Sequence, residues 1–188
     1  GPTNFAYPDG NGASAGQGLS AGRPHAPTSI CGSAVTYDAN GNTLAYDVDG
    51  PSVQLPRTLI YDGENRPLII IRNGLATVFS YGPDTERASK TFNGVTTHYL
   101  GNDSEITFSS TTPSGLVTSY LHPDVRREGT LTDFLIKYHL ASNRVSIRYS
   151  LLPTHSSFSP YGNPKTPGTT KGRAYINERF DPETGLAY

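Results

Sequence analysis

The sequence lacks several features that would point to particular classes of protein. It has a single cysteine, Cys31, so it can form no internal disulfide, and it has no CxxC pair for zinc. Its longest aliphatic run, LIII at residues 68–71, is much shorter than a membrane span or the apolar core of a signal peptide. Tryptophan and methionine are absent. We therefore expect neither a disulfide scaffold nor a membrane protein, and we interpret Cys31 as a small buried apolar residue.

An excess of charge of either sign is also missing. The chain carries 15 Lys and Arg against 16 Asp and Glu, a net charge of −1. Its one basic cluster, Arg126-Arg127, fits a solvated loop, so nothing favours a nucleic-acid or membrane partner. With no signal-like segment, we expect a fragment or a chain exported by a non-Sec route. Gly1-Pro2 is interpreted as the scar of a cleaved tag.

Glycine and proline are abundant, with 20 and 15 residues, and no long stretch has helical spacing. A chain of 188 residues suits one domain. We predict an irregular Gly/Pro-rich arm over residues 1–33 and a β-sheet over residues 34–152. The remainder, residues 153–188, is predicted to be a long loop (153–173), a last strand AYINERF (174–180) and the turn DPETG.

The stretch VTYDANGNTLAYD (residues 35–47) allows two interpretations. Asp38, Asn40 and Asn42 match the first, third and fifth positions of a calcium loop, but Thr43 occupies the sixth position, where glycine is needed, and Asp49 the twelfth. Asn40-Gly41 suits a type I′ hairpin turn, because both residues tolerate a positive φ. We favour the hairpin.

Similar turns recur along the chain and divide it into short segments. They are Asn40-Gly41, DGEN (62–65), Asn73-Gly74, GPDT (82–85) and Asn93-Gly94. From Asp62 onward they are about ten residues apart, which is typical of an all-β meander, and two hairpin strands make a unit of about twenty residues. The residues that we expect to mark the repeat are Tyr37, Asp38, Asn40, Gly41, Tyr61, Asp62, Asn73, Gly74, Tyr81, Gly82, Asn93, Gly94 and Tyr99.

Within the segments, side chains alternate with period two. In LATVFSY (75–81), Leu75, Thr77, Phe79 and Tyr81 share a face opposite Val78. Two later segments, joined by residues 141–143, form a predicted hairpin. Their apolar faces consist of Phe134, Ile136, Tyr138 and Leu140 on the first strand, and Val145, Ile147, Tyr149 and Leu151 on the second.

Several motifs together resemble one family. SAGRPHAPTSICGSAVTYDANGN and the stretch from LIYDGENRPL to LGNDSEI are similar to RHS/YD-repeat sequences. FLIKYHLASNRVSIRY, SPYGNP and GRAYINERFDPETGLAY resemble the RHS repeat-associated core that closes such repeats. The resemblance covers nearly the whole chain after the arm. The core-motif residues are His139, Arg144, Asn177, Glu178, Arg179, Asp181 and Gly185.

This resemblance implies a β-sheet ribbon that spirals into a hollow shell. Such shells enclose a C-terminal toxin in bacterial polymorphic toxins and in the C subunit of Tc toxins, and the YD shell of teneurins is similar. Tyr138 stands where the family commonly has Asp before His-Leu, which weakens any role for that carboxylate here. In many members of the family the core continues past the ERFDPETGL motif to an aspartyl self-cleavage site and a variable toxin. The sequence stops at Tyr188, before any such site, so no cleavage residue is carried over.

Candidate chemical groups do not converge in the sequence. The five histidines (25, 98, 122, 139 and 155) lack metal-ligand spacing to one another or to Cys31, and His98 and His139 are predicted to lie away from any site. Asp47 and Asp49 could share a proton, but Gly50-Pro51 makes a solvated turn the better interpretation. GNGASAGQG lacks the Lys-Ser/Thr of a phosphate loop.

We therefore predict an all-β protein, a curved antiparallel meander, that is a non-catalytic part of a toxin-containing shell and needs no cofactor. A carbohydrate- or surface-binding sheet with exposed tyrosine rows is the alternative, and a hydrolase is the third. The expected partners are the rest of a shell, its cargo, or another copy of the chain. Self-association would use open sheet edges that Pro56, Pro67 and Pro113 protect only in part.

Overall fold

A computed structural model describes residues 5–6, 26–30, 32–47, 56–138, 141–149, 151–158, 165, 173, 175 and 178–187. These residues form strands, turns, bends and irregular backbone, and one residue, Tyr175, has a 3₁₀ conformation. The predicted all-β class is therefore confirmed. The chain divides into two compact units, residues Gly1–Val78 (unit 1) and Phe79–Tyr188 (unit 2).

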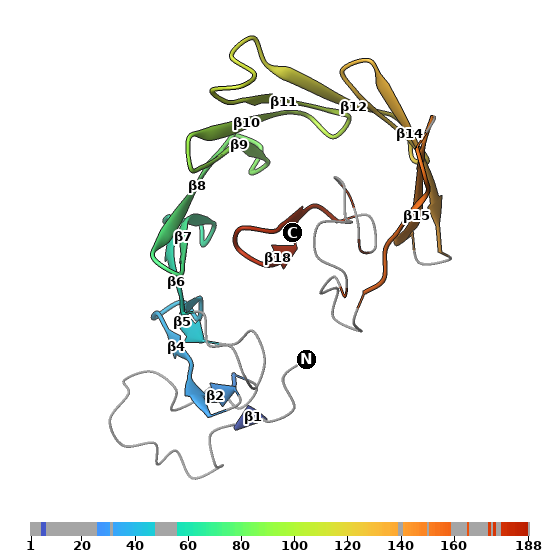
Figure 1. The fold of residues 1–188 in the computed structure, drawn as a ribbon. Coiled ribbons are helices and arrows are strands. Elements are labelled where there is room, and N and C mark those ends of the chain that lie inside the picture. Colours follow the sequence, from blue (N-terminus) through green and yellow to red (C-terminus); the bar gives the residue numbers. More distant parts are fainter. Residues whose placement is uncertain are drawn as a thin grey trace. The chain divides into compact units, whose positions relative to one another are not determined.

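Strands that follow one another in the sequence are also neighbours in the sheet, as a meander requires (Figure 1). Unit 1 contains β1 (Phe5–Ala6), β2 (Ser29–Ile30), β3 (Ser33–Ala34), β4 (Thr36–Tyr37), β5 (Thr43–Asp47), β6 (Pro56–Tyr61), β7 (Pro67–Arg72) and the start of β8 (Leu75–Tyr81). Unit 2 continues with β9 (Arg87–Phe92), β10 (Val95–Leu100), β11 (Ser104–Phe108), β12 (Leu116–His122), β13 (Val125–Glu128), β14 (Leu131–Lys137), β15 (Asn143–Arg148), β16 (Thr154–His155), β17 (Phe180–Asp181) and β18 (Leu186–Ala187). Strands β4 to β16 belong to one 13-stranded sheet, in chain order, while β1–β2–β3 and β17–β18 form two small sheets.

Two-residue turns close alternate hairpins. Asn73 and Gly74 have φ angles of 51° and 75°, and they join the paired residues Arg72 and Leu75. In unit 2, Asn93 and Gly94 repeat this 20 residues later, with φ angles of 47° and 74°. Both φ angles are positive, as a type I′ turn requires, and this turn matches the twist of the flanking strands.

The Tyr-Asp dipeptides introduce a different turn. The Asp62 N–H donates to the Arg66 carbonyl at 3.0 Å, and the Asp62 carboxylate accepts the N–H groups of Glu64 and Arg66, each at 2.9 Å. Only Asn65, with φ of 63°, is left-handed in this loop. The aspartate therefore fixes a longer turn through its side chain.

The same geometry corrects the prediction for Asn40-Gly41. The β4–β5 hairpin is present, but only Gly41 has a positive φ, of 95°, so the turn is not type I′. Asp38 organises the loop instead, because its carboxylate accepts the backbone N–H and the side-chain amide of Asn42, both at 2.8 Å. These bonds use both oxygens of the would-be calcium ligand.

The predicted period-two alternation is present, and the apolar face of β14 is the exposed one. Asp133 is 1% exposed and Leu135 4%, whereas Phe134 is 53% exposed and Ile136 52%. On β8, in contrast, Thr77 and Phe79 are buried and Val78 is exposed. The buried faces are largely polar: five hydrophobic residues are buried among those described, against eleven polar or charged ones. Ion pairs and hydrogen bonds must therefore satisfy much of the interior.

The C-terminal part differs from the predicted loop and strand. Thr154–His155 forms β16 on β15, inside the predicted 153–173 loop. The continuous strand predicted for residues 174–180 is wrong: Tyr175 lies in a turn whose carbonyl accepts the Glu178 N–H at 2.8 Å, and Arg179 returns to form a bridge with Arg173. The DPETG turn is present, with Gly185 at φ of 72°. Because the chain folds back here, only Phe180–Asp181 remains a strand before the turn.

Candidate functional site

The C-terminal strap, defined as the described residues 173, 175 and 178–187, lies on the concave side of the strands of unit 2 (Figure 1). The face of the sheet that meets it is set by the ladder register. Tyr99, Glu105, Thr118 and Glu128 are successive cross-strand partners and therefore share this face. We call it the strap-facing face.

Asp181 holds the strap on the sheet. Its Oδ2 accepts a hydrogen bond from Arg87 Nη1 at 2.7 Å, and its Oδ1 accepts one from Lys90 Nζ at 2.8 Å. The side chains of Asp181 and Arg87 are each only 5% exposed. A charge this well buried is stable only when it is paired and hydrogen-bonded, and Asp181 has both of its oxygens used.

Lys90 links two strap carboxylates. Its Nζ lies 2.6 Å from Glu183 Oε1 as well as 2.8 Å from Asp181. Burial alone would lower the pKa of Lys90, but the attraction of Asp181 and Glu183 outweighs it and raises the pKa above its ordinary value. Lys90 therefore stays charged, and the contact persists across the physiological pH range.

Aromatic rings support the arginines of this contact. The guanidinium of Arg87 lies 4.3 Å from the ring centre of Phe79, and that of Arg179 lies 4.6 Å from the ring centre of Tyr99. Arg179 also approaches Glu105 at 3.6 Å. Cation–π contacts of this kind contribute about 0.5–2 kcal/mol, more when desolvated. The repeat tyrosine Tyr99 thus serves as a platform for a core-motif arginine.

A second attachment lies further along the sheet. The Arg173 guanidinium stands 5.0 Å from the ring centre of Tyr120 and donates a hydrogen bond to the Asn102 carbonyl. Burial is the main cause that raises the pKa of Tyr120. Tyr120 therefore acts as a neutral, half-buried surface for the arginine. The strap is held at two separate places by side chains of the sheet.

The strap-facing face also carries a charge cluster on β13–β15. Asp133, 1% exposed, accepts hydrogen bonds from Arg126 Nη1 at 2.9 Å and from Arg148 Nε at 2.6 Å. Glu128 accepts from Arg126 Nη2 at 3.0 Å and from Arg148 Nη2 at 2.9 Å. Two guanidinium groups thus neutralise two carboxylates. Bidentate contacts of this type fix the geometry of both partners.

These contacts shift the pKa of Glu128. Burial alone would raise it, but the hydrogen bonds from Arg148 and Arg126 dominate and lower the pKa of Glu128 below its ordinary value. The hydrogen bonds to Asp133 and Glu128 raise the pKa of Arg148. Glu128 and Arg148 are therefore both ionised at neutral pH. A group that is fixed in one charge state is suited to structure, not to proton transfer.

The cavities beside the strap are small. One of about 230 Å³ is lined by Tyr81, Thr85, Glu86, Arg87, Gly101, Asn102 and Arg179. Another of about 160 Å³ lies between Lys90, Tyr99, Glu105 and the strap. Ligand pockets usually measure about 300–1,000 Å³. The geometry of these cavities thus suits packing between strap and sheet better than small-molecule binding.

Comparison with solved structures identifies the fold. A Photorhabdus luminescens Tc holotoxin pore with a mutated TccC3 matches at a TM-score of 0.56 and 12% identity, over 83% of this chain and 11% of the other. The crystal structure of TcdB2–TccC3 matches over 88% of this chain and 9% of the other, with 14% identity and a TM-score of 0.43. No family model and no curated protein matches the sequence.

The chain has the fold of part of a Tc toxin. We infer this from the first likeness, whose TM-score exceeds 0.5. The resemblance seen in the sequence motifs is thereby confirmed at the level of the fold. The chain spans about a tenth of the length of the Tc toxin chains that it matches.

The repeat-marking residues occupy turns and the strands beside them in this Tc-like fold. Asp38, Asn40, Gly41, Asp62, Asn73, Gly74, Gly82, Asn93 and Gly94 lie in the turns or next to them. The hydroxyl of Tyr37 donates to the Pro27 carbonyl at 2.9 Å and that of Tyr61 to the Thr43 carbonyl at 3.0 Å. Tyr81 lines the cavity beside Arg87, and Tyr99 contacts both Arg87 and Arg179.

The core-motif residues are only partly brought together. Asp181 and Arg179 belong to the strap contact, and Gly185 completes its turn. Arg144 and Glu178 are exposed, while His139 and Asn177 lie outside the described residues. No motif in the sequence marks Arg87, Lys90 or the Asp133 cluster as part of a site. The pairing of strands β14 and β15 in a hairpin, with the register fixed, would have placed the opposite charges of Asp133 and Arg148 next to each other.

The other chemical candidates remain dispersed. His98, His122 and His155 are exposed; His25, Cys31, Asp49 and His139 lie outside the described residues, as does the Asp47 side chain. Among the described residues, no three His, Cys, Asp or Glu side chains are placed to hold a metal ion. The described part of the chain also has no helix with the length and apolarity to cross a membrane.

Proposed function

We propose that this chain is a non-catalytic structural segment of an RHS-type shell that encloses or delivers a toxin. The observation that carries the proposal is the strap: Asp181 of the core motif is buried against Arg87 and Lys90 on the concave side of the sheet. This arrangement packs the C-terminal motif of the chain onto β9, inside its own repeat sheet. The Tc-like fold and the RHS motifs support it.

The polar character of the buried faces also suits a shell. The strap-facing face is fixed by charge pairs such as Arg148 with Glu128, whose pKa values are shifted in the directions that keep both groups ionised at neutral pH. Most tyrosines on this face are engaged, as Tyr99 and Tyr120 are by arginines. A carbohydrate-binding groove needs tyrosines that are free to stack on sugar rings. We therefore rank the carbohydrate-binding alternative second, and we infer export by resemblance to toxin shells.

The decisive experiment recovers the protein from its native source with an antibody against this chain. We expect this sequence within a longer chain or assembly, in which a separate segment resists added protease until the assembly is denatured. Recovery of the free chain alone, with no protected segment, would contradict the proposal.

A second experiment tests the absence of catalysis. The purified chain is incubated with nuclease, glycosidase, peptidase and esterase substrates, and no turnover above background is expected. Turnover that is abolished by a point substitution, for example Asp133→Asn, would favour the hydrolase hypothesis. A glycan array with wild-type protein and the Tyr149→Ala variant tests the carbohydrate-binding alternative.

A further inference from the structure

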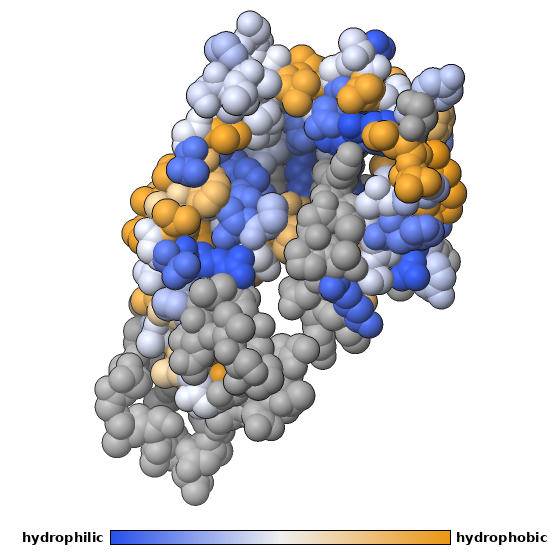
Figure 2. All heavy atoms as spheres, viewed as in Figure 1, coloured by the Kyte–Doolittle hydropathy of each residue, from blue (hydrophilic) through white to orange (hydrophobic). Residues whose placement is uncertain are grey.

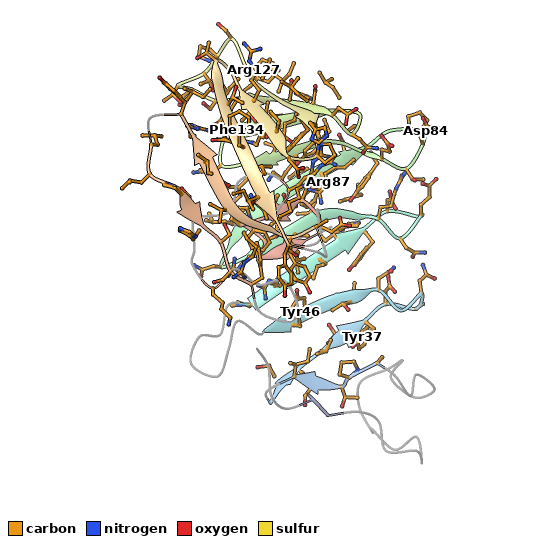
Figure 3. All side chains as sticks on the ribbon, turned by 90° about the vertical axis from the view of Figure 1, so that its right-hand side faces the viewer. Tyr37, Tyr46, Asp84, Arg87, Arg127 and Phe134 are labelled. Carbon is orange, nitrogen blue, oxygen red and sulfur yellow. The ribbon has the colours of Figure 1, made fainter. Side chains whose placement is uncertain are left out.

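The face of unit 2 opposite the strap carries a continuous apolar surface on β13, β14 and β15. We call it the outer apolar patch. It consists of Val125, Phe134, Ile136, Tyr138, Val145, Ile147 and Tyr149. Figure 2 shows hydrophobic residues gathered over β14 and β15, and Figure 3 views this side with Phe134 labelled on β14.

The strand register makes these residues neighbours. Phe134 is paired with Val125 on one side and Ile147 on the other, so three apolar side chains form one row. Ile136 and Val145 are paired in the next row. Tyr138 and Tyr149 extend the patch at its two ends. Directly paired side chains stand about 4.5–5.5 Å apart, so the rows present one apolar surface.

The patch is open to solvent. Phe134, Ile136 and Tyr138 are 53%, 52% and 58% exposed, and Tyr149 is 90% exposed. Isolated exposed apolar side chains are common on proteins, but contiguous patches mark interaction sites. The other face of the same strands is occupied by the charge cluster around Asp133. On β14, therefore, the charged Asp133 is buried and the apolar Phe134 and Ile136 are exposed, the reverse of the usual distribution of charged and apolar residues. This reversal indicates that the outer face meets another apolar surface.

The chemistry of the patch restricts its partner. It contains no ionisable group other than two tyrosine hydroxyls. Its borders carry Arg127 on β13, whose Nε donates to the Gly129 carbonyl at 3.1 Å, and the exposed His155 on β16, the cross-strand partner of Val145. An anionic membrane or a nucleic acid would require a basic surface. A second uncharged apolar surface is the complementary partner.

The patch is also complementary to itself. Its two central rows are apolar, and a tyrosine stands at each end, Tyr138 beyond Ile136 and Tyr149 beyond Ile147. Consider two copies with their patches face to face and a two-fold axis between the sheets, perpendicular to the strands. This axis places the Phe134 row of one copy opposite the Ile136 row of the other. It also brings Tyr138 of one copy to the same end as Tyr149 of the second copy. The tyrosines then form the polar margin around an apolar centre, as interfaces usually have.

The available area is sufficient for such a pair. The exposed parts of Phe134, Tyr138 and Tyr149 amount to on the order of 400 Å², since an aromatic side chain offers about 150–250 Å². The aliphatic members, with Leu151 and Leu152 in the adjoining loop at 61% and 90% exposure, enlarge this surface. The total approaches the ~800 Å² per partner of a standard interface.

We propose that a second copy of this chain packs on the outer apolar patch, forming a two-fold symmetric, sheet-on-sheet dimer. Aligned packing places the two sheets about 10 Å apart with strands within about 30° of each other. In this arrangement Phe134 of each copy contacts Ile136 of the other. The inference does not depend on the proposed shell function, because the strap lies on the opposite face.

Sedimentation equilibrium of the whole chain over a range of concentrations tests the proposal. We expect a monomer–dimer equilibrium for the wild-type chain. Phe134→Ser and Ile136→Thr are each expected to weaken it about 30-fold or more, as loss of a central anchor does. Leu100→Ser, an equally exposed change on β10 outside the patch, is the matched control and should leave the equilibrium unchanged. Circular dichroism verifies that all variants fold.

A cross-linking experiment tests the geometry. On a Cys31→Ser background, Tyr138→Cys and Tyr149→Cys chains are mixed under mild oxidation, and covalent heterodimers are expected. A wild-type chain that stays monomeric at high concentration would overturn the proposal. So would dimers that persist in the Phe134 and Ile136 variants but disappear in Thr154→Pro, because that result assigns the contact to the β16 edge. Binding to neutral lipid vesicles without dimerisation would equally overturn it.

Discussion

Asp181 accepts a 2.7 Å hydrogen bond from Arg87 across 94 positions of the chain. The two side chains are nearly inaccessible to water, and the backbone carbonyl of Asp181 accepts the N–H groups of Thr184 and Gly185 in the DPETG turn that Asp181 begins. This contact joins the last motif of the sequence to β9. It is one of the two attachments of the strap to the sheet, and the other is Arg173 at Tyr120.

Asp181→Ala is expected to release the strap. The substitution leaves Arg87 and Lys90 in a buried environment without the carboxylate that both contact, and breaking a buried pair in this way costs about 3–5 kcal/mol. Urea unfolding measures the loss of stability, and limited proteolysis measures access to the strap. Glu178→Gln, on an exposed strap residue, is the matched control. A variant as stable and protease-resistant as the wild type would refute the assigned role.

Acid should weaken the β13–β15 charge cluster. The folded-state pKa of Glu128 is lowered by its hydrogen bonds to Arg148 and Arg126. A carboxyl group with a depressed pKa stabilises the fold fully above its unfolded pKa, and the contribution is lost as the pH falls through the folded pKa. For Glu128 this loss begins near the ordinary glutamate pKa of 4.5 and continues below it.

Melting temperatures measured between pH 3 and pH 7 test this expectation, with roughly 4 °C lost per kcal/mol in a domain of this kind. Glu128→Gln should be less stable than wild type at pH 7 and should show a flatter decline below pH 4.5. Arg127→Gln, on the opposite face of the same strand, should keep the wild-type slope. If the melting temperatures of wild type and Glu128→Gln fell in parallel below pH 4.5, Glu128 would not contribute to the loss of stability in acid.

Features that depend on neighbouring residues could be predicted from the sequence, whereas those that depend on distant residues could not. The Asn73-Gly74 turn and the alternation of Phe134 with Leu135 arise from neighbouring residues, and both are visible in the sequence. Alternation alone does not tell which face is covered. The burial of Asp133 and the exposure of Phe134 depend on partners elsewhere in the chain or outside it.

The strap contact was beyond sequence reasoning for the same reason. The motif ERFDPETGL indicated Arg179 and Asp181 through family resemblance, but nothing local identifies Arg87 and Lys90 as their partners. The prediction of a strand over residues 174–180 was wrong. It rested on the alternation of apolar and polar residues there, but the backbone turns at Tyr175. Tertiary contacts with Tyr99 and Tyr120 outweigh the local pattern.

Glycines in the hairpin turns should separate into two classes. Gly74 has φ of +75°, and a Cβ added there meets no atom within 4 Å, so Gly74→Ala suffers only the backbone cost of about 1–2 kcal/mol. Gly63 lies in the preceding turn, has no positive φ and is equally uncrowded. Gly63→Ala is expected to be neutral or to stabilise the fold by about 0.4–1 kcal/mol. Chemical denaturation of both variants checks the pair, and equal effects would contradict the turn assignment.

Gly115 combines conformational strain with crowding and should be the most sensitive of these glycines. Its φ is +83°, and an added Cβ would stand 2.8 Å from Ile106 Cγ2 and 2.9 Å from Phe108 Cε1. Both neighbours are on β11, which pairs with β12 directly after the glycine, so their side chains must rotate or shift to admit the added Cβ. Gly115→Ala should therefore cost more than Gly74→Ala, about 2–4 kcal/mol in all, from the left-handed backbone and the overpacking together. Adding Phe108→Ala in the same chain removes one of the two clashes and should recover part of the loss, whereas an additive double variant would show that the contact with Phe108 contributes nothing to the cost.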